Sequence, residues 1–365
     1  MTTVLVTLGT RPEAIKLAPV VAALRARPTL RVRILFTGQH RTLLDQVAAF
    51  FDIVPDADLQ VMQPDQSLSE LTGRLLAGLD AALRDERPDV VLAQGDTTTV
   101  LATGLACYYR KIPFGHVEAG LRTADLFSPF PEEGNRRLVS ILATHHFAPT
   151  DESARNLARE GIPASAIHMT GNTVVDALLE VVTRQLPLPV ALDEGQRLIV
   201  ITLHRRESFG EPLRGVLGAI RDVLWARPDV IAVYPVHLNP NVHGLAHEIL
   251  GGVPNCRLIP PVGYGEMVAL MQRATVILTD SGGVQEEAPS LGVPVLVLRD
   301  TTERPEGIRA GCARLCGTTP DVIVAATLEL LDSPEARARM RAPNPYGDGR
   351  ASARIAEIIE RAYAR

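Results

Sequence analysis

Short apolar runs alternate with amphipathic segments along nearly the whole chain, and this alternation limits the possible folds more than any other feature. Apolar runs of about four to eight residues fit buried strands, whereas longer segments with a period near 3.6 fit helices. Strands that alternate with helices form parallel sheets covered by helices. In the first half, strands are expected at residues 4–8, 32–36, 90–93, 112–117, 146–148 and 167–170. In the second half, they are expected at 198–203, 230–234, 257–259, 276–278 and 293–298.

The length of 365 residues exceeds what one ordinary hydrophobic core supports. We predict an α/β chain of two Rossmann-like doubly wound domains, at 1–175 and 176–350, followed by a helix at 351–365 that could pack back on the N-terminal domain. A proline-rich segment at 186–195 is typical of a linker. Tandem domains of this kind bind ligands in the cleft between them, so the active site is expected there.

Charge and composition argue against several classes of partner. The formal net charge is −5 and aromatic residues make up 4% of the chain, which gives little affinity for nucleic acid or anionic membranes. The N-terminus lacks the features of a secretory signal peptide, and no apolar run approaches the roughly 20 residues that span a membrane. We therefore predict a cytoplasmic protein without nucleic-acid or membrane partners.

The cysteines and histidines do not suggest a metal centre. The cysteines are scattered and lack CxxC spacing, as expected for buried free thiols. The nine histidines are dispersed as well. We predict no metal site.

The first polar loop, GTRPEAIK at 9–16, leads from a strand into a helix. Arg11 and Lys16 in this loop could contact one anion, although a capped helix with surface cations explains the same residues. The loop is neither a GxGxxG fingerprint nor a Walker P-loop. The sequence therefore supports neither a nicotinamide cofactor nor nucleoside triphosphate hydrolysis.

Carboxylates follow two later strands of the first half. Asp96 lies in QGDTTT, where Gly95 permits a tight turn and a following threonine can cap the next helix. Glu118 ends the next strand, and Glu132 opens a helix that also carries Arg136. Consecutive parallel strands would bring Asp96 and Glu118 close together. These residues could thus supply a general acid, a general base and an anion-binding group. Each of them alone also fits a helix cap or a solvated helix face.

Two segments of the second half follow strands in the same way. His204 ends a strand; such a histidine is often structural, but one that faces the cleft could act as an acid or donor. In DSGGVQEE, the amides of residues 281–283 can wrap a diphosphate, and Glu287 is suitably placed for ribose hydroxyls. Arg304 is a further candidate for a phosphate or sugar contact. A glycine-containing helix cap is the plain alternative for DSGG.

Nine segments together resemble the non-hydrolysing UDP-N-acetylglucosamine 2-epimerases: GTRPEAIK, TGQH, QGDTTT, HVEAGLRT, PFPEEGNRR, TGNTVVD, HRRESFG, DSGGVQEEAPSLGVPVL and RDTTERPEG. The resemblance covers nearly the whole chain. It implies a glycosyltransferase-B-like fold, a homodimer and no metal or nicotinamide cofactor. It also implies reversible epimerisation at C2 of UDP-GlcNAc to UDP-ManNAc, by anti elimination of UDP to 2-acetamidoglucal and re-addition. The product would supply ManNAc for cell-envelope polysaccharide.

The same resemblance assigns roles to individual residues. The implied catalytic residues are Asp96, Glu118, Glu132, Arg136 and His204. The implied substrate-binding residues are Arg11, Lys16, Met267, Ser281, Gly282, Gly283, Glu287 and Arg304, with Met267 at a place usually given to an aromatic residue near the uracil. A second, activating UDP-GlcNAc site would involve Gln39, His40, Gln46 and His237. Asp65 stands where some members place an arginine for this site, and an acidic group there would repel a diphosphate.

Three other functions stay open at this stage: a hydrolysing epimerase that releases ManNAc and UDP, a UDP-sugar-dependent glycosyltransferase, and a catalytically silent UDP-sugar sensor. A glycosyltransferase should carry an acceptor groove, and no distinct acceptor-binding segment is evident. A sensor should lack some of the carboxylates, which are all present. A hydrolysing enzyme is often fused to a kinase domain, for which 365 residues leave no room.

Overall fold

The computed structural model describes residues 1–38, 41–193, 195–205 and 208–364, which form two compact units. The first unit comprises Met1–Ala177 and Gly347–Arg365, and the second comprises Leu178–Tyr346. The chain leaves the first unit inside helix α7 (Thr173–Thr183). The proline-rich segment that begins at Leu186 therefore lies in the second unit, after the boundary.

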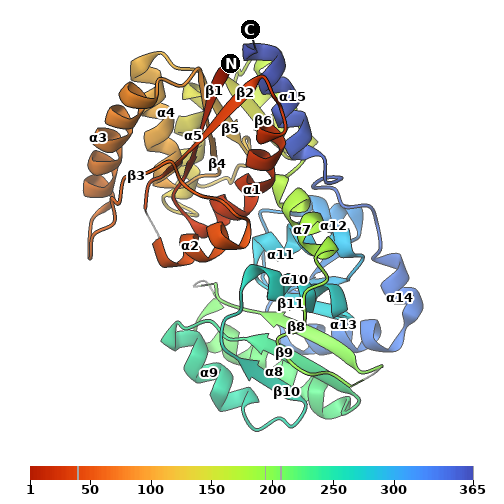
Figure 1. Cartoon of the computed structure of the whole chain (residues 1–365). Helices are drawn as coiled ribbons and strands as arrows, with labels where there is room; N and C mark the ends of the chain where they lie inside the picture. Colours follow the sequence, from red (N-terminus) through yellow and green to blue (C-terminus); the bar gives the residue numbers. More distant parts are fainter. Residues whose placement is uncertain (39–40, 194, 206–207, 365) are drawn as a thin grey trace. The chain divides into compact units, whose positions relative to one another are not determined.

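The first unit is built on a parallel sheet with strand order β3-β2-β1-β4-β5-β6-β7 over its described residues (Figure 1). The strands are β1 (Thr2–Leu8), β2 (Leu30–Phe36), β3 (Ala57–Asp58), β4 (Val90–Gln94), β5 (Phe114–Val117), β6 (His145–Ala148) and β7 (Ile167–Met169). Every residue of β4 and β5 is buried, as expected for strands covered on both faces. The strands predicted for the first half are confirmed. The edge strand β3 has only two residues and lacks an apolar run, so it was not predicted.

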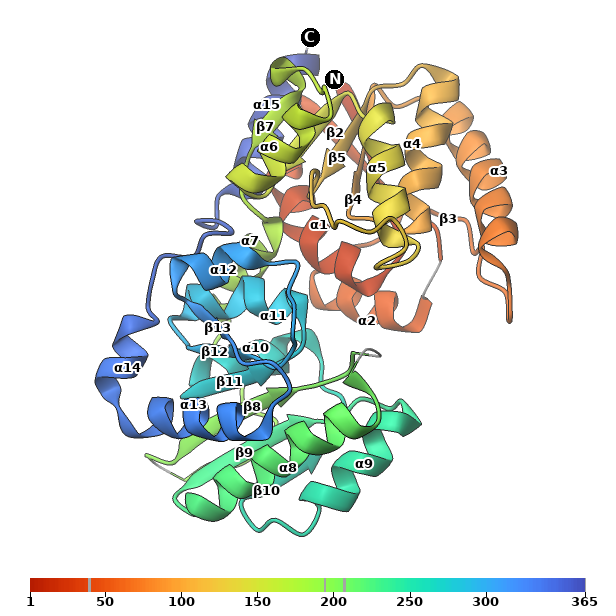
Figure 2. The same cartoon turned by 180° about the vertical axis from the view of Figure 1, so that it is seen from behind.

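Helices cover this sheet on both faces. Its described helical segments are α1 (Arg11–Arg25), α2 (Arg41–Phe50), α3 (Leu68–Glu86), α4 (Thr98–Arg110), α5 (Glu132–Leu142), α6 (Asp151–Arg159), the short η1 (Ala164–Ala166), part of α7, and α15 (Ala351–Tyr363). Helices α3, α4 and α5 pack side by side, while α1 packs against α2 and α15 (Figure 2). The core between the sheet and the first group of helices includes Leu75, Leu79 and Phe114.

Helix α15 packs against α1 of the first unit, and a residue of α7 caps its N-terminus. The Asp176 carboxylate accepts hydrogen bonds from the backbone amides of Ala351 at 3.2 Å and Ser352 at 2.7 Å. Burial raises the pKa of Asp176, although these donors oppose that shift. At the other end of α15, Thr2 Oγ1 donates a hydrogen bond to the Tyr363 carbonyl at 2.7 Å, so the two chain ends lie together.

The second unit repeats the architecture with strand order β10-β9-β8-β11-β12-β13, again all parallel over the described residues. The strands are β8 (Arg197–Thr202), β9 (Val230–Pro235), β10 (Cys256–Ile259), β11 (Val276–Thr279), β12 (Val295–Val297) and β13 (Ala313–Leu315). The helical segments are α8 (Glu211–Ala226), α9 (Pro240–Leu250), α10 (Tyr264–Arg273), α11 (Gly282–Glu287), η3 (Ala288–Leu291), α12 (Pro305–Ala310), α13 (Pro320–Asp332) and α14 (Pro334–Arg339). The five strands predicted for the second half are confirmed, and β13 is an additional edge strand.

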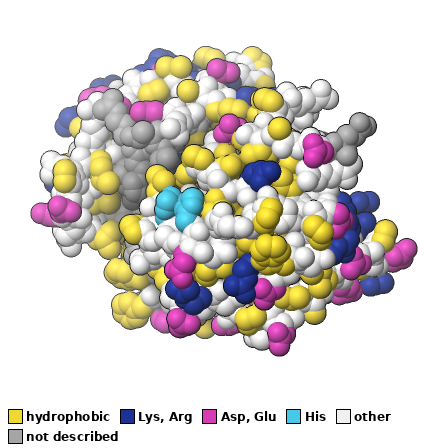
Figure 3. Space-filling model, turned by 90° about the horizontal axis from the view of Figure 1, so that it is seen from below, with side chains coloured by type: hydrophobic (Ala, Val, Ile, Leu, Met, Phe, Trp, Pro, Cys, Tyr) yellow, Lys and Arg dark blue, Asp and Glu magenta, His cyan; other side chains and the backbone are white. Residues whose placement is uncertain are grey.

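Acidic and basic side chains are interspersed with apolar ones on the face shown in Figure 3. That face therefore carries no extended field of one sign. Among the described residues, no helix is long and apolar enough to cross a bilayer.

Candidate active site

In the first unit, the carboxylates singled out from the sequence lie after β4 and β5, beside the point where the strand order reverses between β1 and β4. In open α/β sheets, ligands bind outside the carboxyl ends of the strands at such a switch point. Gly95 turns the chain after β4 with a φ of +89°, a conformation that favours glycine. Thr97 then caps α4, because its hydroxyl accepts a hydrogen bond from the Val100 amide at 3.4 Å. The turn and the cap expected from the sequence are thus confirmed, and Asp96 lies between them.

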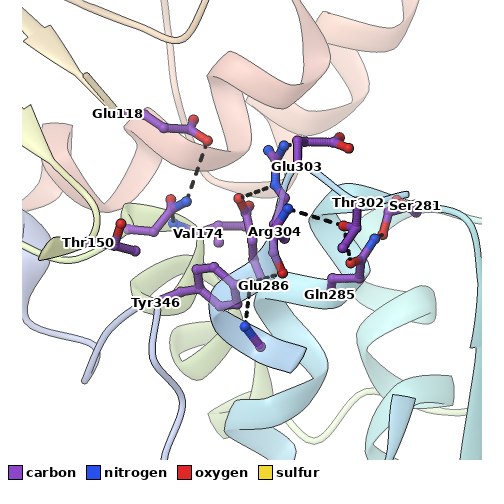
Figure 4. Close-up of polar contacts among 12 residues, drawn as sticks. Glu118, Thr150, Val174, Ser281, Gln285, Glu286, Thr302, Glu303, Arg304 and Tyr346 are labelled. Atoms are coloured by element: carbon purple, nitrogen blue, oxygen red, sulfur yellow. Dashed lines mark hydrogen bonds and ion pairs between the residues drawn. The ribbon is translucent and has the colours of Figure 1, made fainter. Parts of the chain in front are cut away.

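Glu118 follows β5 directly and has a φ of +64°, which is uncommon for a residue with a side chain. Its side chain is only 4% exposed. The Lys16 ammonium lies 2.7 Å from each carboxylate oxygen, and the Gln94 and Asn172 amides donate further hydrogen bonds. Figure 4 shows the Glu118 carboxylate with one of its hydrogen bonds. The position after the strand end and these partners fix the orientation of the Glu118 carboxylate, as proton transfer requires.

Asp96 is held by helix α5. Its Oδ2 accepts a hydrogen bond from Arg136 Nη1 at 2.9 Å, and its backbone carbonyl accepts one from Asn135 Nδ2 at 2.8 Å. Glu133, whose side chain is fully buried, in turn accepts a hydrogen bond from Arg136 Nε at 3.0 Å. Asp96 and Glu118 therefore each contact a cation of their own.

Glu132 is the first residue of α5 and is half-buried. Its Oε2 atom is buried and has no hydrogen-bond donor among the residues that the structure describes. Buried acceptors are normally paired, so an unpaired one is a position where a ligand donor could bind.

Glu13 belongs to the same region, but the sequence did not single it out. Its Oε2 accepts hydrogen bonds from the amides of Gly9 and Thr10 at 2.5 and 2.9 Å, and its Oε1 accepts one from the Thr97 hydroxyl at 2.5 Å. Burial raises the pKa of Glu13 to about 7, although the three donors oppose this shift; the charge of Asp96 adds to the rise. The spacing of Thr10 and Glu13 fits an ordinary capping box, so no separate signal for this residue is present in the sequence.

His116 of β5 supports the Asp96 loop from within the sheet. It is fully buried, and its Nε2 lies 2.7 Å from the Gly95 carbonyl oxygen. Burial, together with the neighbouring Arg122 and Arg136, lowers the pKa of His116 to about 4, although the hydrogen bond to Gly95 opposes this shift. At neutral pH His116 is therefore uncharged, and its Nε2–H donates a hydrogen bond to the Gly95 carbonyl oxygen.

The second unit has its own switch point, between β8 and β11. His204 lies just after β8, and the buried Asp280 lies just after β11. Asp280 Oδ2 accepts hydrogen bonds from the amides of His204 and Arg205 at 2.8 and 2.9 Å, and its Oδ1 lies 3.3 Å from His204 Nδ1. Burial lowers the pKa of His204, while the charge of Asp280 acts in the opposite direction.

The glycine-rich segment after β11 leads into the short helix α11, as predicted. Ser281 precedes the helix, and Gly282 and Gly283 are its first two residues. A Cβ atom on Gly282 would lie 3.3 Å from the Arg304 guanidinium carbon and 3.3 Å from Glu303 Oε1. Glycine at 282 therefore allows the Arg304 side chain to lie against the start of α11.

Arg304 is part of a cluster of arginines and glutamates. Its Nε donates to Glu286 Oε1 at 2.9 Å, and its Nη1 lies 3.0 Å from Glu303 (Figure 4). Burial would raise the pKa of Glu303, but Arg304, Arg299 and Arg205 outweigh it and lower that pKa to about 2. These contacts fix the directions of the guanidinium groups beside the glycine-rich segment.

Glu287, the last residue of α11, is buried, and its Oε1 accepts a hydrogen bond from the Tyr264 hydroxyl at 2.6 Å. Met267 lies on α10 together with Tyr264 and is half-buried. In the first unit, Arg11 is the half-buried first residue of α1.

The residues of the expected second nucleotide-sugar site are divided between the two units. Gln46 is exposed on α2. His237 is exposed after β9, and its ring centroid lies 6.0 Å from that of His204. Gln39 and His40 lie outside the described residues.

Comparison with known proteins identifies the family of the chain. The family model described as UDP-N-acetylglucosamine 2-epimerase matches residues 22–360. The chain belongs to this family. It is 52% identical to the UDP-N-acetylglucosamine 2-epimerase of Escherichia coli strain K12 over 98% of both chains.

Solved structures of the epimerase family agree with this assignment. The UDP-GlcNAc 2-epimerase of Neisseria meningitidis, bound to UDP-GlcNAc, matches with a TM-score of 0.92 and 45% identity over 99% of this chain and 100% of that one. The glycotransferase of kitacinnamycin matches with a TM-score of 0.66 and 16% identity over 99% and 98% of the chains, so it shares the fold alone. The chain is an epimerase, hence an isomerase, with the two-domain α/β fold of glycosyltransferase-B proteins.

The described residues offer no alternative metal-dependent centre. Within them, no three His, Cys, Asp or Glu side chains are grouped as a metal site requires. Cys107, Cys256, Cys312 and Cys316 are all buried free thiols, as expected from the sequence.

Proposed function

We propose that this epimerase is non-hydrolysing and interconverts UDP-GlcNAc and UDP-ManNAc by anti elimination of UDP to 2-acetamidoglucal and re-addition of UDP. The observation that carries the proposal is the arrangement after β4 and β5, where Asp96 and Glu118 each contact a cation of their own. Two oriented carboxylates are what proton transfer at the two faces of C2 requires.

The chemistry explains why elimination comes first. The C2 hydrogen of the sugar is not next to a carbonyl, so a side chain cannot remove it directly at a useful rate. When the bond between C1 and the UDP oxygen breaks, the electron pair leaves with UDP and positive charge develops at C1. A carboxylate then takes the C2 proton, and the electron pair of that C–H bond forms the C1=C2 double bond. Return of a proton to the other face of C2, with re-addition of UDP at C1, gives the epimer.

In the first unit, we assign proton transfer to Asp96, Glu118 and Glu132. Arg136 and Lys16 would stabilise the charge that moves between substrate and protein. The unpaired Oε2 of Glu132 supports a direct contact with the sugar.

In the second unit, we assign UDP binding to the segment after β11. The backbone amides of Ser281, Gly282 and Gly283 would bind the diphosphate, and Arg304 would stabilise its charge. Glu287 would accept hydrogen bonds from the ribose hydroxyls. His204 would donate a hydrogen bond to the departing diphosphate. Groups that hold UDP after C1–O cleavage favour re-addition over loss of the glycal, which supports the non-hydrolysing reaction.

We further propose a cytoplasmic homodimer whose interface includes helices α4 and α5. These helices contact each other, and they expose the large apolar side chains of Tyr108, Tyr109, Leu138 and Ile141. An exposed apolar patch of this kind is typical of a protein–protein interface. UDP-GlcNAc would also bind a second, activating site that includes Gln46 and His237.

Product analysis tests the proposed function. Purified protein is incubated with UDP-GlcNAc that carries ¹⁸O in the bridge between C1 and the β-phosphorus, and the products are separated and examined by mass spectrometry and ³¹P NMR. We expect a mixture of UDP-GlcNAc and UDP-ManNAc in which part of the label has moved to non-bridging positions. Steady accumulation of UDP and free ManNAc would instead identify a hydrolysing epimerase. UDP-ManNAc that keeps all of the label in the bridge and, in D2O, also keeps its original C2 hydrogen would contradict elimination and re-addition.

A further inference from the structure

We propose that Glu13 is a positioning residue for the reaction: its buried carboxylate holds Thr97 and thereby sets the orientation of the neighbouring Asp96. This inference rests on the proposed function, because Asp96 is assigned there to proton transfer at C2. Glu13 lies on α1, whereas Asp96 and Thr97 belong to the loop between β4 and α4. The two segments flank the switch point of the first sheet.

The surroundings of Glu13 differ from those of an ordinary capping glutamate. In a capping box, the carboxylate serves the N-terminus of its own helix. Glu70 of α3 fits that description, because it is exposed and accepts from the Ser67 amide at 2.8 Å. Glu13 also accepts from the Thr10 amide, but it is 2% exposed and has a further donor, Thr97, from another loop. Burying a carboxylate is costly, so capping alone is a poor explanation for this arrangement.

The hydrogen bonds of Thr97 require an acceptor at Glu13. The Thr97 hydroxyl accepts from the Val100 amide, so its own proton is directed to Glu13 Oε1 at 2.5 Å. Glu13 Oε2 is already an acceptor for two amides. All three contacts are satisfied by an ionised carboxylate. In a protonated Glu13, Oε2 stays the acceptor for the two amides, so the added proton lies on Oε1 and faces the Thr97 hydroxyl. The Thr97 proton must then rotate away, and the hydroxyl loses its acceptor at Glu13.

Buried side chains from three further positions hold the rest of the loop. His116 lies against the Gly95 carbonyl at 2.7 Å, Asn135 donates to the Asp96 carbonyl at 2.8 Å, and Arg136 donates to the Asp96 carboxylate at 2.9 Å. Glu13 holds the next residue of the loop, Thr97, by accepting the hydrogen bond of its hydroxyl. Loss of this support would let the Asp96 carboxylate move relative to the sugar, and small displacements of a catalytic group lower the rate strongly.

Titration of Glu13 should then appear in the rate. The charged groups to consider are Asp96, with its partner Arg136, and the Lys16–Glu118 pair, since Lys16 lies one helical turn after Glu13. Burial and the Asp96 charge raise the pKa of Glu13 to about 7. Because the ionised form holds Thr97, kcat should rise as the pH increases through about 7.

The test compares kcat, KM and their pH dependence in the full-length wild-type protein and in Glu13→Gln, with UDP-GlcNAc as substrate. The glutamine has nearly the same volume and resembles the protonated acid. We expect kcat to fall about 10- to 100-fold with KM within about threefold, and the rise near pH 7 to disappear. The matched control is Glu70→Gln, which changes a capping glutamate on α3 and should keep both the wild-type kcat and the wild-type pH profile.

Two further variants keep the inference testable if Glu13→Gln fails to fold. Thr97→Val removes the hydroxyl and should reproduce the loss in kcat with a wild-type circular dichroism spectrum, whereas Thr97→Ser should recover most of the activity. Wild-type kcat and pH profiles in Glu13→Gln, or in a folded Thr97→Val variant, would overturn the positioning role. A wild-type protein that does not epimerise UDP-GlcNAc would instead overturn the proposed function.

Discussion

Replacement of Lys16 by methionine tests how strongly the first unit depends on its buried ion pair. Lys16 Nζ lies 2.7 Å from both carboxylate oxygens of Glu118, and the two side chains are 12% and 4% exposed. Unit charges about 3 Å apart attract by about 5 kcal/mol at an effective dielectric constant of about 20. The desolvation of Lys16 offsets part of this attraction, and removal of one partner from a buried pair typically costs about 3 to 5 kcal/mol. We expect Lys16→Met to lower the free energy of unfolding of the first unit by about 3 kcal/mol.

The matched variant removes both charges. Glu118→Gln alone should also cost about 3 kcal/mol, and Lys16→Met with Glu118→Gln should cost only about 2 kcal/mol, instead of the sum of about 6 kcal/mol. The difference measures the coupling between the two charges, because the double variant leaves neither charge buried without the other.

Hydrogen exchange with mass spectrometry at increasing urea concentration is the appropriate assay, because it resolves the two units. The single tryptophan, Trp225, lies in α8 of the second unit, so its fluorescence cannot report on the first. Peptides of β4 and β5 should lose protection in Lys16→Met, and peptides of β8 and β11 serve as an internal control. A loss below about 1 kcal/mol in Lys16→Met, or additive losses in the double variant, would show that the Lys16–Glu118 pair contributes little to stability.

Three further predictions concern other parts of the protein. Tyr264→Phe removes the hydroxyl that contacts Glu287 at 2.6 Å, so KM for UDP-GlcNAc should rise about three- to tenfold with a smaller change in kcat, measured by steady-state kinetics. Asp280→Asn removes a negative charge that raises the pKa of His204 against the effect of burial. The midpoint of the His204 titration in NMR spectra should therefore move to still lower pH, and kcat should fall about tenfold. A midpoint that moves to higher pH would contradict this prediction. Ile141→Asp places a charge in the proposed dimer interface, at an α5 side chain that is 78% exposed. Light scattering should detect a monomer, and the circular dichroism spectrum should stay normal. A dimer that persists in this variant would place the interface elsewhere.

Strands, turns and helix caps could be predicted from the sequence where one local physical rule determines them. Strands β1 and β4 are apolar runs buried on both faces, so their presence follows from the hydrophobic pattern alone. Because the carboxyl ends of parallel strands share one edge of a sheet, Asp96 and Glu118 could be predicted to follow neighbouring strands. The turn at Gly95 and a threonine cap after it follow from backbone chemistry in the same way.

Buried contacts between residues far apart in the chain could not be predicted from the sequence. The spacing of Thr10 and Glu13 indicates only a helix cap, and nothing in it shows that Thr97 supplies a third donor from 84 positions away. The docking of α15 likewise depends on Asp176, a residue of α7 that gives no local signal of capping a helix so far along the chain. Such contacts arise from the tertiary fold, and a local pattern cannot reveal them.

In the proposed reaction, UDP leaves C1 before the C2 proton is exchanged, and UDP then returns to the sugar. Proton NMR of the purified protein with UDP-GlcNAc in D2O tests it most directly, because it follows the anomeric signals and the C2 position in one sample. We expect UDP-ManNAc with deuterium at C2, gradual deuteration of the UDP-GlcNAc pool, and no free sugar. UDP-ManNAc that keeps its original C2 hydrogen, or free ManNAc accumulating with UDP, would contradict it.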